Sequence, residues 1–298
     1  ATTEIYTLSL HDALPICPPG IAFVLQPMWS SVAVATVAGI AVTALVRLSQ
    51  RAPRFTALLP VVAAFVVACI VFAAARHGLV EAPLRTLLAP LAVLLPGALL
   101  VTAMAELVTG HMVAGTSRLG YGLVQVLLFT LGILGAARLL PLASADLANV
   151  RINDIGWYAA PLGLVLVTLA IALLESPPPR LVPWIFVVLV LAFGAQVAGQ
   201  ALGGAVGGAF LGALVAILGS YAVESVVPRL ARLVVFLPSF WLLVPGSLGV
   251  LAATQVAVDP TADADVLGVV GIVAAIALGL LLGAAIAQGL GGIARRRS

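Results

Sequence analysis

The sequence predicts an all-α integral membrane protein with nine transmembrane helices. The chain is 63% hydrophobic and only 8% charged, with a mean hydropathy of +1.23, whereas soluble domains carry about 25% charged residues. Its apolar segments are about 20 residues long, which is enough for a helix to cross a bilayer. They show no strand-like alternation of the kind found in barrels. We expect spans at 28–46, 55–75, 87–104, 119–140, 157–174, 181–199, 202–223, 232–252 and 266–290.

The first sixteen residues differ from the rest of the chain and resemble a translated sequencing adapter. They contain neither a basic segment nor an apolar core, so they do not form a signal peptide. We therefore expect no function from 1–16 and treat the native start as missing. The remaining chain divides into an incomplete N-terminal half at 17–140, a C-terminal half at 157–290 and a basic tail at 291–298.

Arginine predicts the orientation of the spans, since all 14 basic residues are arginine. Ten of them lie in the C-terminal tail and in the connections that follow the first, third, fifth and seventh spans. The alternate connections hold four. The positive-inside rule then places the C-terminus in the cytoplasm of a cell (inner or plasma) membrane protein. With nine spans the visible N-terminus lies outside, and a missing first span would explain this.

An internal repeat is suggested by LLPGALL at 94–100 and LVPGSLG at 243–249, which are 149 residues apart. The same offset relates 55–75 to 204–224 and 119–140 to 268–289. The span at 157–174 would pair with a segment upstream of residue 26. We expect two five-span halves with the first span missing, and an odd number of spans makes the repeats inverted in the membrane. Chance similarity of two apolar segments remains the alternative.

The stretch from Leu94 to Arg118 is the strongest candidate for a binding site. Pro96 and Gly97 break its span, because proline lacks a backbone donor and glycine relaxes the local backbone. In lipid, broken backbone is tolerated only where it is buried in protein or lines a wet cavity. Polar residues then follow an apolar lead-in, and they include Thr102, Glu106, Thr109 and His111.

Glu106 is the central residue of this stretch, and we expect Thr102 and Thr109 to share its helical face. A carboxylate near lipid needs a partner or water. Glu106 could bind a substrate ammonium or carry a coupling proton. Alternatively, it is an interfacial residue that pairs with Arg118 or is solvated.

The neighbouring polar residues have weaker functional interpretations. His111 could relay protons, although a solvated residue in a short turn is the simpler interpretation. Thr116 and Ser117 are expected to cap a helix. Arg118 is expected to anchor the cytoplasmic end of a span.

The second half offers Pro245, Gly246, Ser247 and Gln255 at matching positions. Gln255 falls on Glu106 at the offset of 149, so the site would be asymmetric, with one proton carrier. Trp241 either lines this site or anchors the interface.

Two motifs resemble the threonine/serine exporter family: PGALLVTAMAELVTGHMVAGTSRLGYGL at 96–123 and FLPSFWLLVPGSLGVLAATQ at 236–255. The resemblance extends over roughly 21–290. It implies a ten-span inner-membrane protein of two five-span domains that exports threonine and serine using the proton-motive force. The first span and the cytosolic segment before it are absent here, and the activity of this chain as it stands is left open.

The function expected from these observations is proton-coupled export of small amino acids. Export of another small organic acid and a non-transporting structural role are the alternatives. The chain has no HExxH, GxSxG or P-loop motif, so we expect no enzyme. We also expect no cofactor, metal or nucleic acid. Membrane lipid is the expected surrounding partner, and a homo-oligomer is left open.

Overall fold

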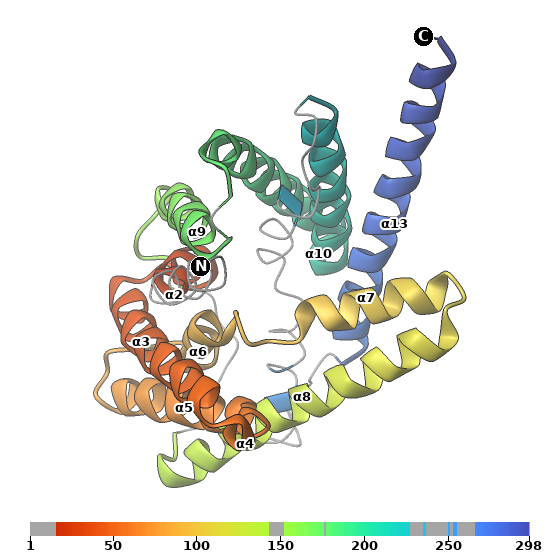
Figure 1. The fold of residues 1–298 in the computed structure, drawn as a ribbon. Coiled ribbons are helices and arrows are strands. Elements are labelled where there is room, and N and C mark those ends of the chain that lie inside the picture. Colours follow the sequence, from red (N-terminus) through yellow and green to blue (C-terminus); the bar gives the residue numbers. More distant parts are fainter. Residues whose placement is uncertain are drawn as a thin grey trace. The chain divides into compact units, whose positions relative to one another are not determined.

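The computed structural model describes residues 16–142, 152–175, 177–226, 235–236, 250, 253–254 and 266–297. All the regular elements in these residues are helices (Figure 1). They are α2 (Cys17–Leu25), α3 (Trp29–Arg51), α4 (Pro53–Thr56), α5 (Leu59–Arg76), α6 (Pro83–Leu91), α7 (Gly97–Val108), α8 (Met112–Leu139), α9 (Ala159–Glu175), the 3₁₀ turn η2 (Pro179–Leu181), α10 (Val182–Val226) and α13 (Val266–Arg297).

Five helical segments in the described chain are long and apolar enough to cross a membrane: Trp29–Arg51, Leu59–Arg76, Met112–Leu139, Pro179–Val226 and Leu267–Gly289. Two shorter apolar helices are Gly97–Val108 and Ala159–Leu174. A helix satisfies all its interior backbone groups, which is why apolar segments adopt it in lipid. The count of nine spans stays a prediction, because most of the segment at 232–252 lies outside the described residues.

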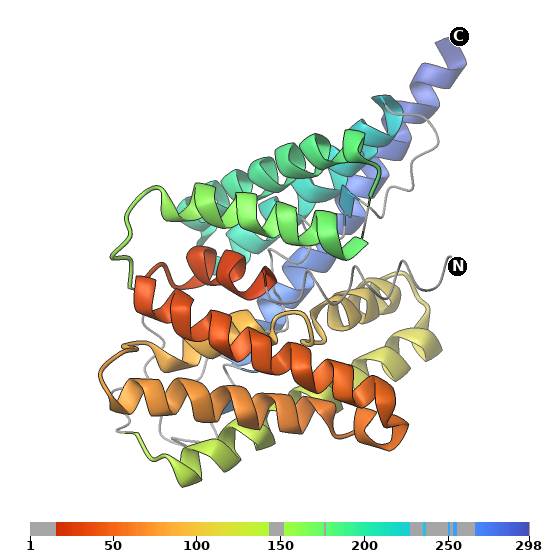
Figure 2. The same cartoon turned by 60° about the vertical axis from the view of Figure 1, so that its left-hand side comes forward.

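The chain divides into two compact units. Unit 1 comprises Ala1–Pro96, Leu123–Ser176 and Gly246–Ala264, and unit 2 comprises Gly97–Gly122, Pro177–Pro245 and Asp265–Ser298. In unit 1, α3, α5 and α6 pack on one another, and α2 packs along α9 (Figure 2). In unit 2, α13 packs along α10 and α7.

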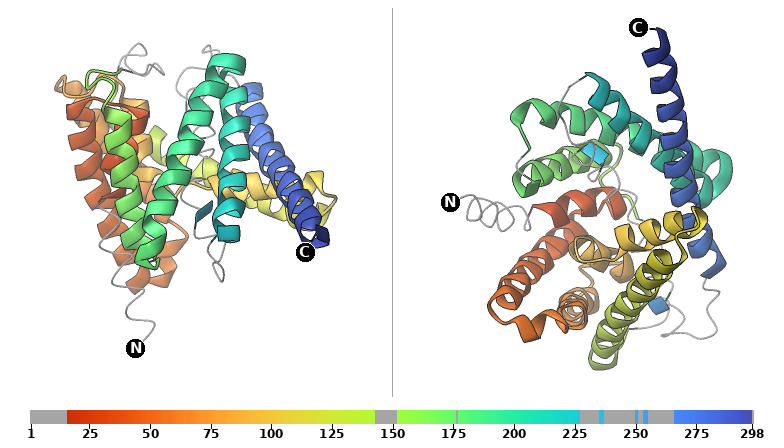
Figure 3. Two further views of the ribbon diagram at one scale, coloured as in Figure 1. Left: turned by 90° about the horizontal axis from the view of Figure 1, so that it is seen from above. Right: turned by 45° about the vertical axis from the view of Figure 1, so that its right-hand side comes forward.

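Helix α10 consists of two antiparallel arms that lie side by side with α13 (Figure 3). The turn falls at Gly203 and Gly204, and Gly204 has φ of +63°, which L side chains rarely adopt. Beyond the turn, a methyl group on Gly207 would stand 2.7 Å from the Gly199 carbonyl oxygen. The spans expected at 181–199 and 202–223 are therefore the two arms of this hairpin.

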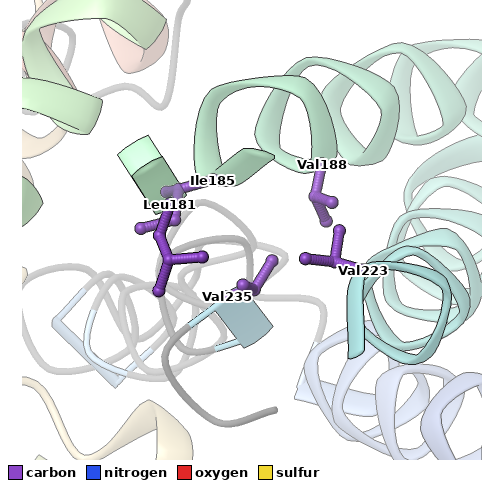
Figure 4. Close-up of a cluster of buried hydrophobic side chains, with 5 residues drawn as sticks. All are labelled: Leu181, Ile185, Val188, Val223 and Val235. Carbon is purple, nitrogen blue, oxygen red and sulfur yellow. The ribbon is translucent and has the colours of Figure 1, made fainter. Parts of the chain in front are cut away.

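A buried cluster joins the two arms of α10 to a residue beyond them (Figure 4). Its members are Leu181, Ile185, Val188, Val223 and Val235. Subtracting 149 from these numbers gives residues of α3, α5 and α6: Val32, Thr36, Gly39, Ala74 and Thr86. Those three helices pack together in unit 1. Corresponding segments of the two units are thus packed together in the same combination.

The same offset recurs in a close helix contact in each unit, where a glycine of one helix packs against three residues on one face of another. In unit 1, Gly132 packs against Val61, Ala64 and Phe65. In unit 2, Gly279 packs against Phe210, Ala213 and Leu214, which follow the first three residues by 149. The two glycines themselves are 147 residues apart. An internal repeat would produce this agreement.

The unit to which the chain belongs changes within both of the spans that are expected to be broken. Helix α6 belongs to unit 1 and α7 to unit 2, with the change at Pro96–Gly97. In the second half, Val235 belongs to unit 2, whereas Val250 and Thr254 belong to unit 1. The chain thus changes from unit 1 to unit 2 in the first half and from unit 2 to unit 1 at the corresponding place in the second half.

Candidate functional site

The helical segment expected at 87–104 is interrupted and consists of α6 and α7 separated by a short turn. Helix α6 ends at Leu91, and the backbone N–H groups of Leu94 and Leu95 both donate to the Leu91 carbonyl, at 2.8 and 3.2 Å. Pro96 follows, and α7 begins at Gly97. Both residues are buried. The interruption expected from the proline and glycine is confirmed.

Helix α7 places Thr102 and Glu106 one turn apart, and a glycine-dependent turn ends it. Gly110 has φ of +86°. The N–H of Gly110 donates to the Leu107 carbonyl at 3.1 Å, and the N–H of His111 donates to the Glu106 carbonyl at 2.8 Å. This pair of bonds is the Schellman arrangement, in which a left-handed residue satisfies the last carbonyls of a helix. The turn therefore fixes His111 at the end of the Glu106 helix.

Two further glycines allow the start of α8 to approach α7 closely. A methyl group on Gly115 would stand 2.8 Å from Leu107 Cγ, and one on Gly122 would stand 2.6 Å from Leu100 Cδ2. Both distances are shorter than van der Waals contact. Packing of the two helices at these glycines brings Arg118 opposite Glu106.

Glu106 Oε1 forms an ion pair with Arg118 Nη1. The Glu106 side chain is 22% exposed and that of Arg118 is 44% exposed. The second carboxylate oxygen, Oε2, is buried and has no hydrogen-bond partner among the described residues. Arg118 stabilises the ionised carboxylate, and Oε2 retains unused acceptor capacity.

Thr109 and His111 form a separate polar pair just after the end of α7, the helix that contains Glu106. The Thr109 hydroxyl donates to the Ala105 and Glu106 carbonyls, at 2.9 and 3.1 Å. Its oxygen lies 3.0 Å from His111 Nδ1. Both residues are exposed, as is Thr102. His111 is thus a solvated turn residue in this structure, and any role in proton relay stays a prediction.

The expected capping role of Thr116 and Ser117 is wrong, because both lie inside α8. Helix α8 begins at Met112, earlier than the expected boundary at 119. The Thr116 hydroxyl donates to the Met112 carbonyl at 2.7 Å and to the Val113 carbonyl at 3.2 Å. A threonine hydroxyl that donates to carbonyls of its own helix can lie in the helix interior and does not cap a helix end.

The second-half candidates Pro245, Gly246, Ser247 and Gln255 lie outside the described residues, as does Trp241. The described neighbour Thr254 is buried, and its hydroxyl oxygen has no hydrogen-bond partner in the part of the chain that the structure describes. Thr254 precedes the expected counterpart of Glu106. These second-half residues stay predictions.

A buried polar group that the sequence did not single out joins α2 to α3 in unit 1. Gln26 is 1% exposed, and its Oε1 accepts the Ile152 N–H at 3.4 Å. The Pro27 carbonyl accepts the N–H groups of Asp154 and Ile155 at 3.1 and 3.2 Å. The only signal in the sequence is a glutamine before a proline between apolar segments. These bonds fix the loop before α9.

The helices and their apolar faces define a multi-pass helical membrane protein with a carboxylate near the end of α7. The family model described as "Putative threonine/serine exporter" matches residues 13–140. This confirms the resemblance in the stretch that contains α7 and Glu106, and the matched range ends before the second motif at 236–255. No curated protein and no solved structure matches the chain significantly.

Proposed function

We propose that this chain is a secondary transporter that exports threonine or serine in exchange for protons. The single observation that carries the proposal is Glu106, a carboxylate in the last turn of α7 with one oxygen paired to Arg118 and the other buried without a partner among the described residues. A buried acceptor without a partner is costly. A proton or a cationic group bound at Oε2 would remove that cost.

The length of α7 separates the proposed position for substrate binding, at its start, from the proposed position for proton binding, at Glu106. The N-terminus of α7 carries the positive end of the helix dipole, which favours the carboxylate of an amino acid. Nine residues separate Gly97 from Glu106, which is about 13 Å along a helix. That exceeds the separation between the charged groups of one amino acid. With the substrate bound at the break, Glu106 binds and releases the coupling proton. Thr102 lies between the break and Glu106 along α7.

In the second half, Pro245, Gly246, Ser247 and Gln255 are proposed to contribute to substrate binding. The reciprocal exchange of α6, α7, Val235 and Val250 between the units supports a second broken span. Gln255 in place of a carboxylate leaves Glu106 as the proton carrier. His111 is the next candidate if Glu106 does not carry the proton.

The proposed architecture is two inverted five-span repeats in the cell membrane with a cytoplasmic C-terminus. It can be tested with single cysteines at Gln50 and Leu202, both exposed, in a chain whose native Cys17 and Cys69 are replaced by alanine. Gln50 precedes the connection between α3 and α5, and Leu202 lies at the corresponding turn of α10. We expect an impermeant maleimide to label Leu202→Cys only from outside and Gln50→Cys only from the cytoplasm. Labelling of both from one side would contradict inversion.

Transport is tested directly with the purified chain in sealed vesicles. We expect radiolabelled threonine or serine to be driven against its gradient by an imposed proton gradient, and an uncoupler to abolish this. Transport of only other organic acids would change the substrate, and no solute flux would favour a structural role.

A further inference from the structure

A surface hollow of about 560 Å³ lies along the second half of α3 in unit 1. It is lined by Ile40, Thr43, Ala44, Arg47, Leu48 and Arg51. Arg47 and Arg51 are exposed and one helical turn apart, so both guanidinium groups belong to one face of the helix. The hollow therefore combines two positive charges with an apolar wall.

The apolar wall extends along the same helix from Leu48, between the two arginines, back to Val37. Val37, Ile40 and Leu48 are 57%, 55% and 50% exposed. With Ala44 they follow helical spacing and form one stripe. Thr43 does not contribute a free donor to the hollow, because its hydroxyl donates to the Gly39 carbonyl at 2.8 Å.

The length of α3 places its two ends at the two edges of a bilayer. Trp29 begins the helix, is 59% exposed and packs edge-on against Phe23 with ring centroids 5.5 Å apart. Eighteen residues separate Trp29 from Arg47, which is about 27 Å along a helix and close to the hydrocarbon thickness. Tryptophan is enriched at membrane interfaces. With Trp29 at one interface, Arg47 and Arg51 stand at headgroup level on the other.

Two of the last carbonyls of α3 are already used within the protein. The Ala52 N–H donates to the Leu48 and Ser49 carbonyls, at 3.1 and 3.3 Å. Of the residues that line the hollow, Leu48 therefore has its carbonyl paired, and the arginines contribute guanidinium donors. Guanidinium groups bind phosphate oxygens strongly through charge-assisted hydrogen bonds.

We propose that this hollow is a binding site for one anionic phospholipid. Arg47 and Arg51 bind the headgroup phosphate, and an acyl chain lies along Ile40 and Val37 toward the membrane centre. Charge complementarity and the continuous apolar stripe select a lipid over a soluble anion. Each arginine near an anionic membrane surface contributes about 1 kcal/mol, or roughly fivefold in affinity.

The test measures thermal unfolding of the detergent-solubilised chain with added phosphatidylglycerol or phosphatidylcholine. We expect phosphatidylglycerol to raise the Tm more than phosphatidylcholine does. The double variant Arg47→Gln with Arg51→Gln should lose most of that difference. Ala44→Trp, which fills the hollow without changing charge, should lose it as well. The charge-matched control is Arg76→Gln with Arg138→Gln, at exposed ends of α5 and α8, and it should keep the difference.

Three outcomes would overturn the lipid site. One is an equal response to both lipids. A second is an equal loss in the Arg76 and Arg138 control, which would indicate a general surface-charge effect. The third is an equal rise in Tm with soluble glycerol phosphate, which would make the hollow a phosphate site that needs no acyl chain.

Discussion

Replacing Glu106 with glutamine is expected to abolish proton-driven export while leaving substrate exchange intact. Glutamine keeps the shape and most of the hydrogen-bonding capacity of Glu106, but it cannot take up and release a proton. Export against a gradient should therefore fall to background. Exchange of labelled for unlabelled threonine requires no net proton movement, so it should continue near the parent rate. Both assays use the chain in sealed vesicles, with the unsubstituted protein as the parent.

Glu81→Gln is the matched control for Glu106→Gln, since Glu81 is an exposed carboxylate in a loop before α6. It should transport like the parent. If the Glu106 variant drives threonine against a gradient as well as the parent does, Glu106 is an interfacial residue paired with Arg118. Loss of both export and exchange would instead assign Glu106 to substrate binding.

Exchanging the charges of Glu106 and Arg118 should restore stability but not transport. Arg118→Glu alone places two carboxylates side by side and should lower the free energy of unfolding by about 1–2 kcal/mol, because the pair is only partly exposed. The double variant Glu106→Arg with Arg118→Glu re-forms an ion pair between α7 and α8. Its unfolding should return toward the parent value, with a favourable coupling energy in a double-mutant cycle.

Transport by the charge-exchanged double variant distinguishes the two interpretations of the pair. A structural ion pair works in either direction, so transport would recover together with stability. A proton carrier at position 106 cannot be replaced by arginine, which is always protonated in proteins. We therefore expect the double variant to fold and remain inactive in proton-driven export.

The sequence predicted most of the described helices after residue 28, because apolar composition and length decide whether a segment can cross a bilayer. The break at Pro96 and Gly97 was also predictable, since proline removes a donor whatever its surroundings. The start of α8 was not, because Thr116 and Ser117 are polar and resemble a helix boundary. The Thr116 hydroxyl instead bonds within the helix, which composition alone does not reveal.

The pairing of Glu106 with Arg118 was available from the sequence only as one of several interpretations. Twelve positions separate the two residues, and the turn at Gly110 decides whether they meet. Close packing at Gly115 and Gly122 then sets the distance between the helices. These are properties of two helices in contact, so they became visible only in the structure.

The exchange of segments between the units also constrains how the protein is made. Unit 1 contains α2 and, much later in the chain, Val250 and Thr254. During synthesis the chain emerges from its N-terminus, so the early helices must wait for most of the polypeptide before their unit is complete. Contacts between residues so far apart in sequence slow folding. Until then, unit 1 lacks the residues that the late part of the chain, including Val250 and Thr254, contributes to it.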